Sequence, residues 1–137
     1  TKMVTFDWES ALDFNGQSAP YIQYAHVRAN SILRKAGLEQ PEVPQFNYDL
    51  QTSEINLIEL LARLPDEIQR AAKELKPSLV ANFAYDLAKA FNDFYNQCPV
   101  LNAEPAIRAA RLALVAAART CLVKVLTLMG IRAPEVM

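Results

Sequence analysis

The sequence is poor in glycine, with three among its 137 residues, at positions 16, 37 and 130. Loops that hold nucleotide phosphates, in P-loop proteins and in dinucleotide-binding folds, need several glycines within a few residues. The three glycines here are far apart in the sequence. Both kinds of nucleotide site are therefore excluded from this chain.

Cysteine and histidine are also scarce. Cys98 and Cys121 are the only cysteines, they do not form a CxxC motif, and His26 is the only histidine. A structural zinc site of four Cys and His ligands cannot be built from three such residues. We expect no metal in this chain, and two reduced cysteines, as is usual for a cytoplasmic protein.

Long apolar runs are missing as well. No run reaches the ~18 residues that a membrane span requires, and the longest, at 112–118, is bounded by Arg111 and Arg119. Lys2 is followed by an acidic and aromatic stretch rather than by the apolar core of a signal peptide. We expect no membrane association. The first residue is Thr, which suggests a segment of a longer protein.

What is present is typical of a folded domain. Hydrophobic residues make up 52% of the chain and charged residues 21%, which excludes intrinsic disorder. A chain of this length can bury about two-thirds of its unfolded surface. We predict one domain covering residues 1–137.

Proline and glycine positions predict the secondary structure. Proline is favoured at the first position of a helix, and glycine at the left-handed position just after its end. The predicted helices span residues 8–14, 21–35, 52–64, 66–75, 78–96 and 106–129. Gly16, Gly37 and Gly130 would end the first, second and last of them. No alternating strand pattern appears, so the prediction is an all-α bundle of about six helices.

Two further features follow from the same pattern. The segment 38–51 contains Pro41 and Pro44, is acidic, and should be an exposed loop. In the last helix, helical periodicity predicts one packed face. That face comprises Ala110, Leu114, Ala117, Cys121, Val125 and Leu128.

The formal net charge is only −1, but the charge is unevenly distributed. Residues 19–36 contain three basic side chains and no acid, residues 37–70 two arginines against seven acids, and residues 104–137 five basic side chains against two acids. If the two basic helices lie side by side, they create a positive surface on a neutral protein. The alternative is that these are ordinary solvated faces.

The first candidate binding residues lie in the second predicted helix. Tyr21, Tyr24 and Arg28 are spaced i, i+3 and i+7 and share one face. Two phenol rings and a guanidinium suit base stacking and phosphate contact. Alternatively, the rings pack into the core with their hydroxyls satisfied. His26 lies off this face and is interpreted as a structural residue.

The second candidate region is 91–101. Helical spacing directs Phe91 and Phe94 towards the core and leaves Asn92 and Tyr95 at its margin, where a splayed nucleic-acid base could be contacted. The alternative is a helix that simply ends before Pro99. No nucleophile–base pair and no acid/base carboxylate pair can be identified, so the sequence argues against an active site.

Several strings together carry a family resemblance. They are Phe-Asp-Trp-Glu-Ser-Ala-Leu at 6–12, Pro-Tyr-Ile-Gln-Tyr-Ala-His-Val-Arg at 20–28, Tyr-Asp-Leu-Ala at 85–88, Phe-Asn-Asp-Phe-Tyr at 91–95, Arg-Leu-Ala-Leu at 111–114 and Ala-Pro-Glu-Val-Met at 133–137. The chain resembles the C-terminal anticodon-binding domain of arginyl-tRNA synthetases over nearly its whole length. The Asp-Ala-Leu-Arg string that names this DALR-type domain class is not literally present.

The resemblance implies an all-helical domain of a class I synthetase that binds the anticodon stem-loop of an arginine-accepting tRNA. In that family it follows a catalytic domain that uses ATP, with Mg, to attach arginine. The two motifs of that domain, similar to His-Ile-Gly-His and Lys-Met-Ser-Lys, are absent here. The implied partners are tRNA and the parent's own catalytic domain, with no cofactor and no catalysis in this segment alone.

The resemblance also suggests site residues by position. Tyr21, Tyr24 and Arg28 would form one anticodon-facing region, Tyr95, Pro99 and Val100 a second, and Met137 would lie near the anticodon loop. We add Asn92 and Arg132 from proximity and chemistry. Two other interpretations stay open, namely a helical protein-interaction module with an apolar groove and the anticodon-binding domain of another class I synthetase.

Overall fold

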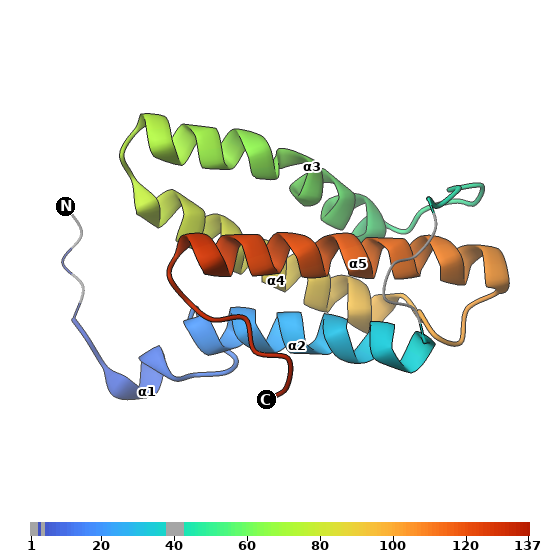
Figure 1. Cartoon of the computed structure of the whole chain (residues 1–137), viewed down its shortest axis with the longest axis horizontal. Coiled ribbons are helices and arrows are strands. Elements are labelled where there is room, and N and C mark those ends of the chain that lie inside the picture. Colours follow the sequence, from blue (N-terminus) through green and yellow to red (C-terminus); the bar gives the residue numbers. More distant parts are fainter. Residues whose placement is uncertain (1–2, 4, 38–42) are drawn as a thin grey trace.

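The computed structural model describes residues 3, 5–37 and 43–137 of the chain. Within them lie five helices and no strand, which confirms the all-α prediction (Figure 1). The helices are α1 (Trp8–Ala11), α2 (Ala19–Ala36), α3 (Thr52–Lys73), α4 (Pro77–Gln97) and α5 (Pro105–Leu128). The predicted number of about six is one too many.

The difference arises at Pro65. We predicted that one helix ends at Leu64 and another begins after Pro65, but α3 continues through this proline. A proline inside a helix removes one backbone hydrogen bond and crowds the preceding turn. Here Pro65 is exposed, while Leu57, Leu64 and Ala71 are buried at seven-residue intervals on both sides of it. Burial of this continuous stripe keeps α3 together, and Figure 1 shows the helix bending along its length.

The first helix is shorter than predicted. The Asp7 carboxylate accepts a hydrogen bond of 2.9 Å from the Ser10 N–H and caps α1, which ends at Ala11. The prediction that Gly16 ends this helix is wrong, because the positive φ angles among the glycines belong to Gly37 and Gly130. The chain between α1 and α2 instead forms a loop.

The other helix ends largely follow the predicted signals. Ser18 caps α2, and Gly37 ends it with a φ of 69°. Pro77 and Pro105 occupy the first positions of α4 and α5. Of the predicted loop at 38–51, residues 38–42 lie outside the described residues. Residues 43–51 contain no helix.

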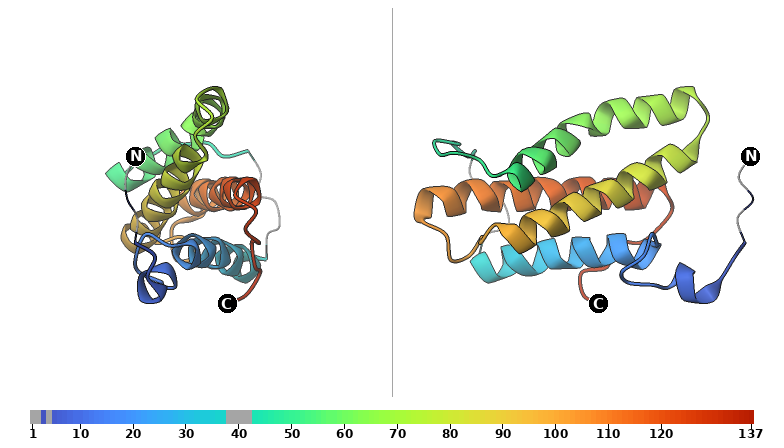
Figure 2. Two further views of the ribbon diagram at one scale, coloured as in Figure 1. Left: turned by 90° about the vertical axis from the view of Figure 1, so that its left-hand side faces the viewer. Right: turned by 180° about the vertical axis from the view of Figure 1, so that it is seen from behind.

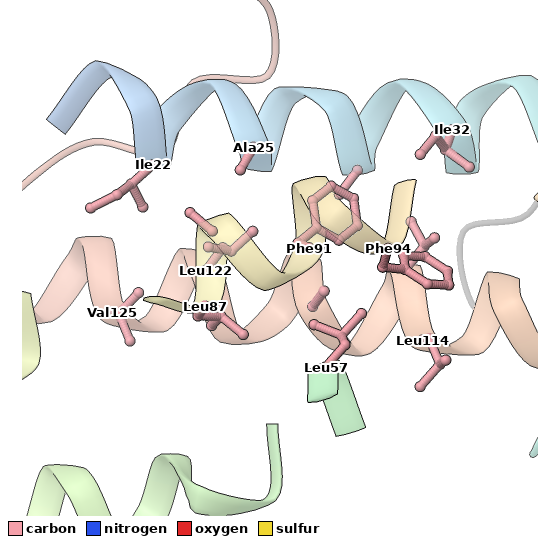
Figure 3. Close-up of a cluster of buried hydrophobic side chains, with 14 of the residues drawn as sticks. Ile22, Ala25, Ile32, Leu57, Leu87, Phe91, Phe94, Leu114, Leu122 and Val125 are labelled. Carbon is pink, nitrogen blue, oxygen red and sulfur yellow. The ribbon is translucent and has the colours of Figure 1, made fainter. Parts of the chain in front are cut away.

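Helix α4 lies at the centre of the bundle and packs against α2, α3 and α5. Figures 1 and 2 show α2 and α3 on opposite sides of the bundle, with α5 running beside α2. Side chains from all four helices meet in the core (Figure 3). The largest fully buried ones include Phe91, Phe94, Leu57, Leu87 and Leu122.

Helix α5 buries a wider arc than the predicted face. Ala110, Leu114 and Val125 are buried as predicted, but Ala117 and Leu128 are exposed. The reason is that α5 packs against three other helices, so neighbouring faces are covered as well. The buried hydrophobic residues that the prediction missed are Leu112, Val115, Ala118, Leu122 and Leu126, and the charged Arg111 is buried as well.

Among the residues that the structure describes, none of the helices is both long and apolar enough to cross a membrane. No cluster of three or more His, Cys, Asp or Glu side chains suited to a metal ion occurs in the part of the chain that the structure describes.

Candidate nucleic-acid interface

Arg28 joins α2 to α4 and is the centre of the candidate site. Its Nη1 donates a hydrogen bond to Oδ1 of Asn92. Its guanidinium carbon lies 4.7 Å from the ring centroid of Tyr24 and 4.7 Å from that of Tyr95. Each such cation–π contact is worth about 0.5–1 kcal/mol at exposed sites. Four of the predicted residues therefore form one connected group.

The two tyrosines of this group present surface to solvent. Tyr24 is 40% exposed and Tyr95 42% exposed, whereas Asn92 is only 9% exposed. Asn92 thus lies deeper than the core margin predicted for it, because its amide oxygen accepts the bond from Arg28. The exposed surfaces of the rings remain free for a flat aromatic ligand.

The residues of this group line two cavities. The larger, about 580 Å³, has three aromatic rings and three side-chain amides in its wall. These belong to Phe14, Tyr21, Tyr24, Asn15, Asn92 and Asn96. The smaller, about 270 Å³, lies between α2 and the end of α4, where Tyr95, Pro99 and Val100 line it together with Ile32 and Leu101.

The charges around the two cavities differ. Arg28 lines both, but the larger cavity is also lined by the acidic Asp93. Among the residues that the structure describes, the smaller cavity is lined by Lys35 and by no acidic residue. A phosphate is attracted to a site with two cations and repelled by a nearby carboxylate. A phosphate is therefore bound more favourably beside the smaller cavity, and the larger cavity suits a neutral base with polar edges.

Tyr21 contributes less surface than Tyr24. It is half-buried, packs against the core, and its ring lies 5.3 Å from that of Tyr85. It still lines the larger cavity. Tyr24 is thus turned outwards and Tyr21 mostly inwards, so packing into the core describes Tyr21 better than Tyr24.

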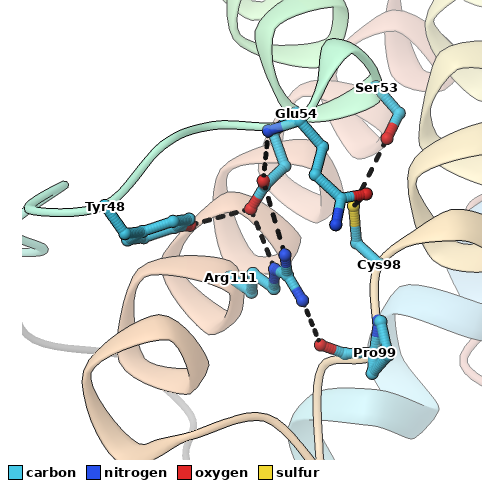
Figure 4. Close-up of polar contacts among 7 residues, drawn as sticks. Tyr48, Ser53, Glu54, Cys98, Pro99 and Arg111 are labelled. Carbon is cyan, nitrogen blue, oxygen red and sulfur yellow. Dashed lines mark hydrogen bonds and ion pairs between the residues drawn. The ribbon is translucent and has the colours of Figure 1, made fainter.

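The turn at Pro99 is held by a buried ion pair (Figure 4). Arg111 on α5 donates from Nη1 to the Pro99 carbonyl oxygen at 2.8 Å and from Nε to Oε1 of Glu54 at 2.9 Å. The side chains of Arg111 and Glu54 are 7% and 0% exposed. The hydroxyl of Tyr48 donates to Oε1 of Glu54 at 2.7 Å, and the Gln51 N–H donates to Oε2 at 2.9 Å.

This environment keeps both members of the pair charged. Burial alone would raise the pKa of Glu54, but the hydrogen bonds from Arg111, Gln51 and Tyr48 outweigh it and hold the pKa below its ordinary value. Burial opposes the charge on Arg111 too, and Glu54 raises its pKa nevertheless. Burial, followed by the hydrogen bond to Glu54, raises the pKa of Tyr48 to about 12.

His26 lies elsewhere on α2 and is 3% exposed. Its Nε2 lies 3.0 Å from Nδ2 of Asn30. Burial lowers its pKa, with a smaller lowering from the charge of Arg119 and an opposing effect of Glu135. It lines neither cavity, in agreement with its interpretation as a structural residue.

Arg132 and Met137 are not part of the group around Arg28. They lie on the C-terminal segment, which runs from α5 back to α2 (Figure 1). The Arg132 carbonyl oxygen accepts a hydrogen bond of 2.8 Å from Nε2 of Gln23, and Met137 is 51% exposed. Neither residue lines the two cavities. Seven of the nine predicted residues thus lie together and two lie apart.

Sequence reasoning missed several cavity residues. Lys35 follows Arg28 by seven positions and Asn96 follows Asn92 by four, so helical spacing contained a signal for both. Phe14 and Asn15 come from the loop after α1 and reach the larger cavity only through the fold. Glu54 and Arg111 had no comparable local signal, because each is one of several charged residues in its part of the sequence.

The two basic helices, α2 and α5, do lie side by side (Figure 1). Arg111, however, is buried and paired with Glu54. Its charge therefore adds nothing to a positive surface. The cations at the candidate site come from α2, as Arg28 and Lys35.

Comparison with known proteins decides the family. Residues 22–137 match the model of the DALR anticodon binding domain. The chain belongs to this family. The DALR domain found here therefore has the fold class that the sequence resemblance implied, although the tetrapeptide behind the name is absent.

Similar proteins agree with this assignment. The arginine–tRNA ligase of Haloarcula marismortui is 46% identical over 100% of this chain and 24% of its own length. That of Pyrococcus abyssi is 48% identical over 98% of this chain and 22% of its own length. The DALR domain thus spans about a quarter of the relatives it matches and corresponds to the anticodon-binding domain of arginyl-tRNA synthetases.

Solved structures lead to the same conclusion. The arginyl-tRNA synthetase of Thermus thermophilus superposes with a TM-score of 0.91 at 38% identity, over 99% of this chain and 24% of that one. The enzyme of Plasmodium falciparum superposes with a TM-score of 0.83 at 26% identity, over 96% of this chain and 23% of that one. The resemblance to arginyl-tRNA synthetases seen in the sequence is confirmed.

Proposed function

We propose that the chain is the anticodon-binding part of an arginine–tRNA ligase and holds unstacked anticodon bases at the Arg28 group. The observation that carries the proposal is the set of exposed tyrosine rings around Arg28 in a member of this family. The parent enzyme would attach arginine to its tRNA in the cytoplasm, with ATP and Mg bound in the rest of the protein. The chain described here would bind tRNA without catalysing the reaction.

In the larger cavity, one base stacks on the exposed ring of Tyr24. Phe14, whose ring centroid lies 6.4 Å from that of Tyr24, extends the aromatic wall. The amides of Asn92 and Asn96 lie in the same cavity and can exchange hydrogen bonds with the polar edge of a base. Stacking of this kind is worth about 1–3 kcal/mol per base.

In the smaller cavity, a second base contacts the ring of Tyr95 and the apolar wall formed by Pro99 and Val100. A phosphate on its backbone lies near Arg28 and Lys35, where none of the described lining residues is acidic. The two cavities share Arg28, so neighbouring nucleotides can occupy them together. Met137 and Arg132 would contact the RNA from the C-terminal segment.

The test is a titration of the chain with an RNA hairpin that carries the anticodon stem and loop of an arginine tRNA, at low and moderate salt. We expect binding that weakens as salt rises, because phosphate contacts release counterions. The control hairpin has the same stem and a changed anticodon, and we expect it to bind less tightly. Equal affinity for the two hairpins, or no binding at low salt, would overturn the proposal.

A further inference from the structure

The buried pair of Glu54 and Arg111 lies behind the candidate site rather than in it. We infer that Arg111 is a positioning residue for RNA recognition, because it fixes the Pro99 turn that forms one wall of the smaller cavity. The inference rests on the proposed function. Arg111 would not touch the RNA, and its effect would pass through the Pro99 carbonyl.

The geometry of the guanidinium supports this role. Nε of Arg111 donates to one oxygen of Glu54 at 2.9 Å and Nη2 lies 3.5 Å from the other, so the carboxylate fixes the plane of the guanidinium. The remaining nitrogen, Nη1, then donates to the Pro99 carbonyl oxygen at 2.8 Å. The rigid, planar fork of arginine is what allows one side chain to serve both acceptors.

The hydrogen bond to the Pro99 carbonyl attaches the backbone of the turn to Arg111. Proline has no backbone N–H, so the carbonyl is the one backbone group of Pro99 that can form a hydrogen bond. Pro99 follows Cys98, the residue that caps the end of α4. It comes four residues after Tyr95 and is followed by the buried Val100. Movement of this carbonyl therefore shifts the wall of the cavity relative to the Tyr95 ring.

Glu54 is itself held in place from two sides. Tyr48 in the preceding loop and the backbone of Gln51 both donate to its carboxylate. The pair thus connects the loop before α3, α3 itself, α5 and the turn after α4 (Figure 4). Stability alone does not require such a pair, since apolar side chains of similar volume often replace buried ion pairs without loss. An apolar replacement, however, cannot donate a hydrogen bond to the Pro99 carbonyl oxygen.

The experiment uses the double variant Glu54→Leu with Arg111→Met. It removes both charges and fills the same space with apolar side chains. The control is Arg63→Met with Glu67→Leu, which removes an ion pair of 2.8 Å within α3 and also the contact of 3.1 Å between Glu67 and Arg70. We measure Kd for the arginine-anticodon hairpin and for the hairpin with a changed anticodon. The methyl resonances of Val100 report the position of the turn without RNA.

We expect the folded double variant to bind the arginine hairpin about tenfold more weakly. The ratio between its Kd values for the two hairpins should be smaller than in the parent chain, and its Val100 methyl resonances should be shifted. The control should bind like the parent chain. A folded double variant with unchanged Kd and unchanged discrimination would overturn the inference.

A second variant keeps the inference testable if the double variant does not fold. Arg111→Lys retains the positive charge but cannot reach both acceptors with fixed geometry, so we expect an intermediate loss of affinity. Unchanged binding by this variant would also overturn the inference. Failure of the parent chain to bind the hairpin would instead refute the proposed function, and the Val100 resonances would still report whether Arg111 positions the turn.

Discussion

Replacement of Glu54 by Gln should destabilise the domain severely. The change keeps the size of the side chain but removes its charge, and the Arg111 guanidinium, 7% exposed, then has no anion beside it. Removing one partner of a buried pair costs about 3–5 kcal/mol. Domains of this kind are typically stable by only ~5–15 kcal/mol. The variant should therefore lose a large part of its free energy of unfolding.

The assay is urea unfolding at pH 7, followed by the helical circular dichroism signal. Glu59→Gln is the matched control, because it removes the same charge from an exposed position on the same helix, α3. Surface changes of this type usually stay within about 0.5 kcal/mol. A loss below about 1 kcal/mol in Glu54→Gln would refute the view that the pair holds these segments together.

The same carboxylate predicts a dependence on pH. Its folded-state pKa is lowered from the ordinary value of 4.5. The stabilisation is therefore complete above that value and is lost as the pH falls through the lower, folded-state pKa. Unfolding free energies measured between pH 7 and pH 3 should fall more steeply for the parent chain than for Glu54→Gln. Parallel curves would contradict the assigned role of Glu54.

Three other changes test the RNA-binding face. Tyr24→Ala should weaken binding of the arginine hairpin by about 1–3 kcal/mol through loss of a stacked base. The control Phe46→Ala removes a ring of similar exposure (38% against 40%) and should leave binding unchanged. A loss under about 0.5 kcal/mol for Tyr24→Ala would contradict stacking. Arg28→Ala should flatten the dependence of Kd on salt more than Arg34→Ala does. Arg34 is the control because it carries the same charge on the same helix but lines neither cavity. Equal salt slopes of Kd for the two variants would argue against a phosphate near Arg28. Gly37→Ala should lower the free energy of unfolding in urea by about 1–2 kcal/mol, because the φ of 69° at this position is left-handed. The change should not alter Kd for the hairpin. An unchanged unfolding midpoint would contradict the expected backbone strain.

Local signals in the sequence predicted most of the fold because they act within a few residues. Prolines at the first turns of α4 and α5 and Gly37 after α2 mark real helix ends. Pro65 misled the prediction, because its effect depends on whether a buried stripe continues beyond it. That information lies in the packing of α3 against α4 rather than in the local sequence.

The candidate site was predictable where its residues share one helix. The spacing of Tyr24 and Arg28 placed them on one face, and that is where the structure has them. The contact of Arg28 with Asn92 joins residues 64 positions apart, so no local pattern could reveal it. The ion pair of Glu54 and Arg111 spans 57 positions and was equally hidden from local patterns.

The bridge from Arg28 to Asn92 and Tyr95 means that the site exists only when α2 and α4 are packed together. A peptide with the sequence of either helix would carry half of the site and should have little affinity for RNA. Conversely, RNA that binds only the packed form adds to its stability by mass action, by about 2.7 kcal/mol at a concentration one hundred times Kd. Transfer of this recognition surface to another scaffold would require moving two helices and the turn after α4 as a unit.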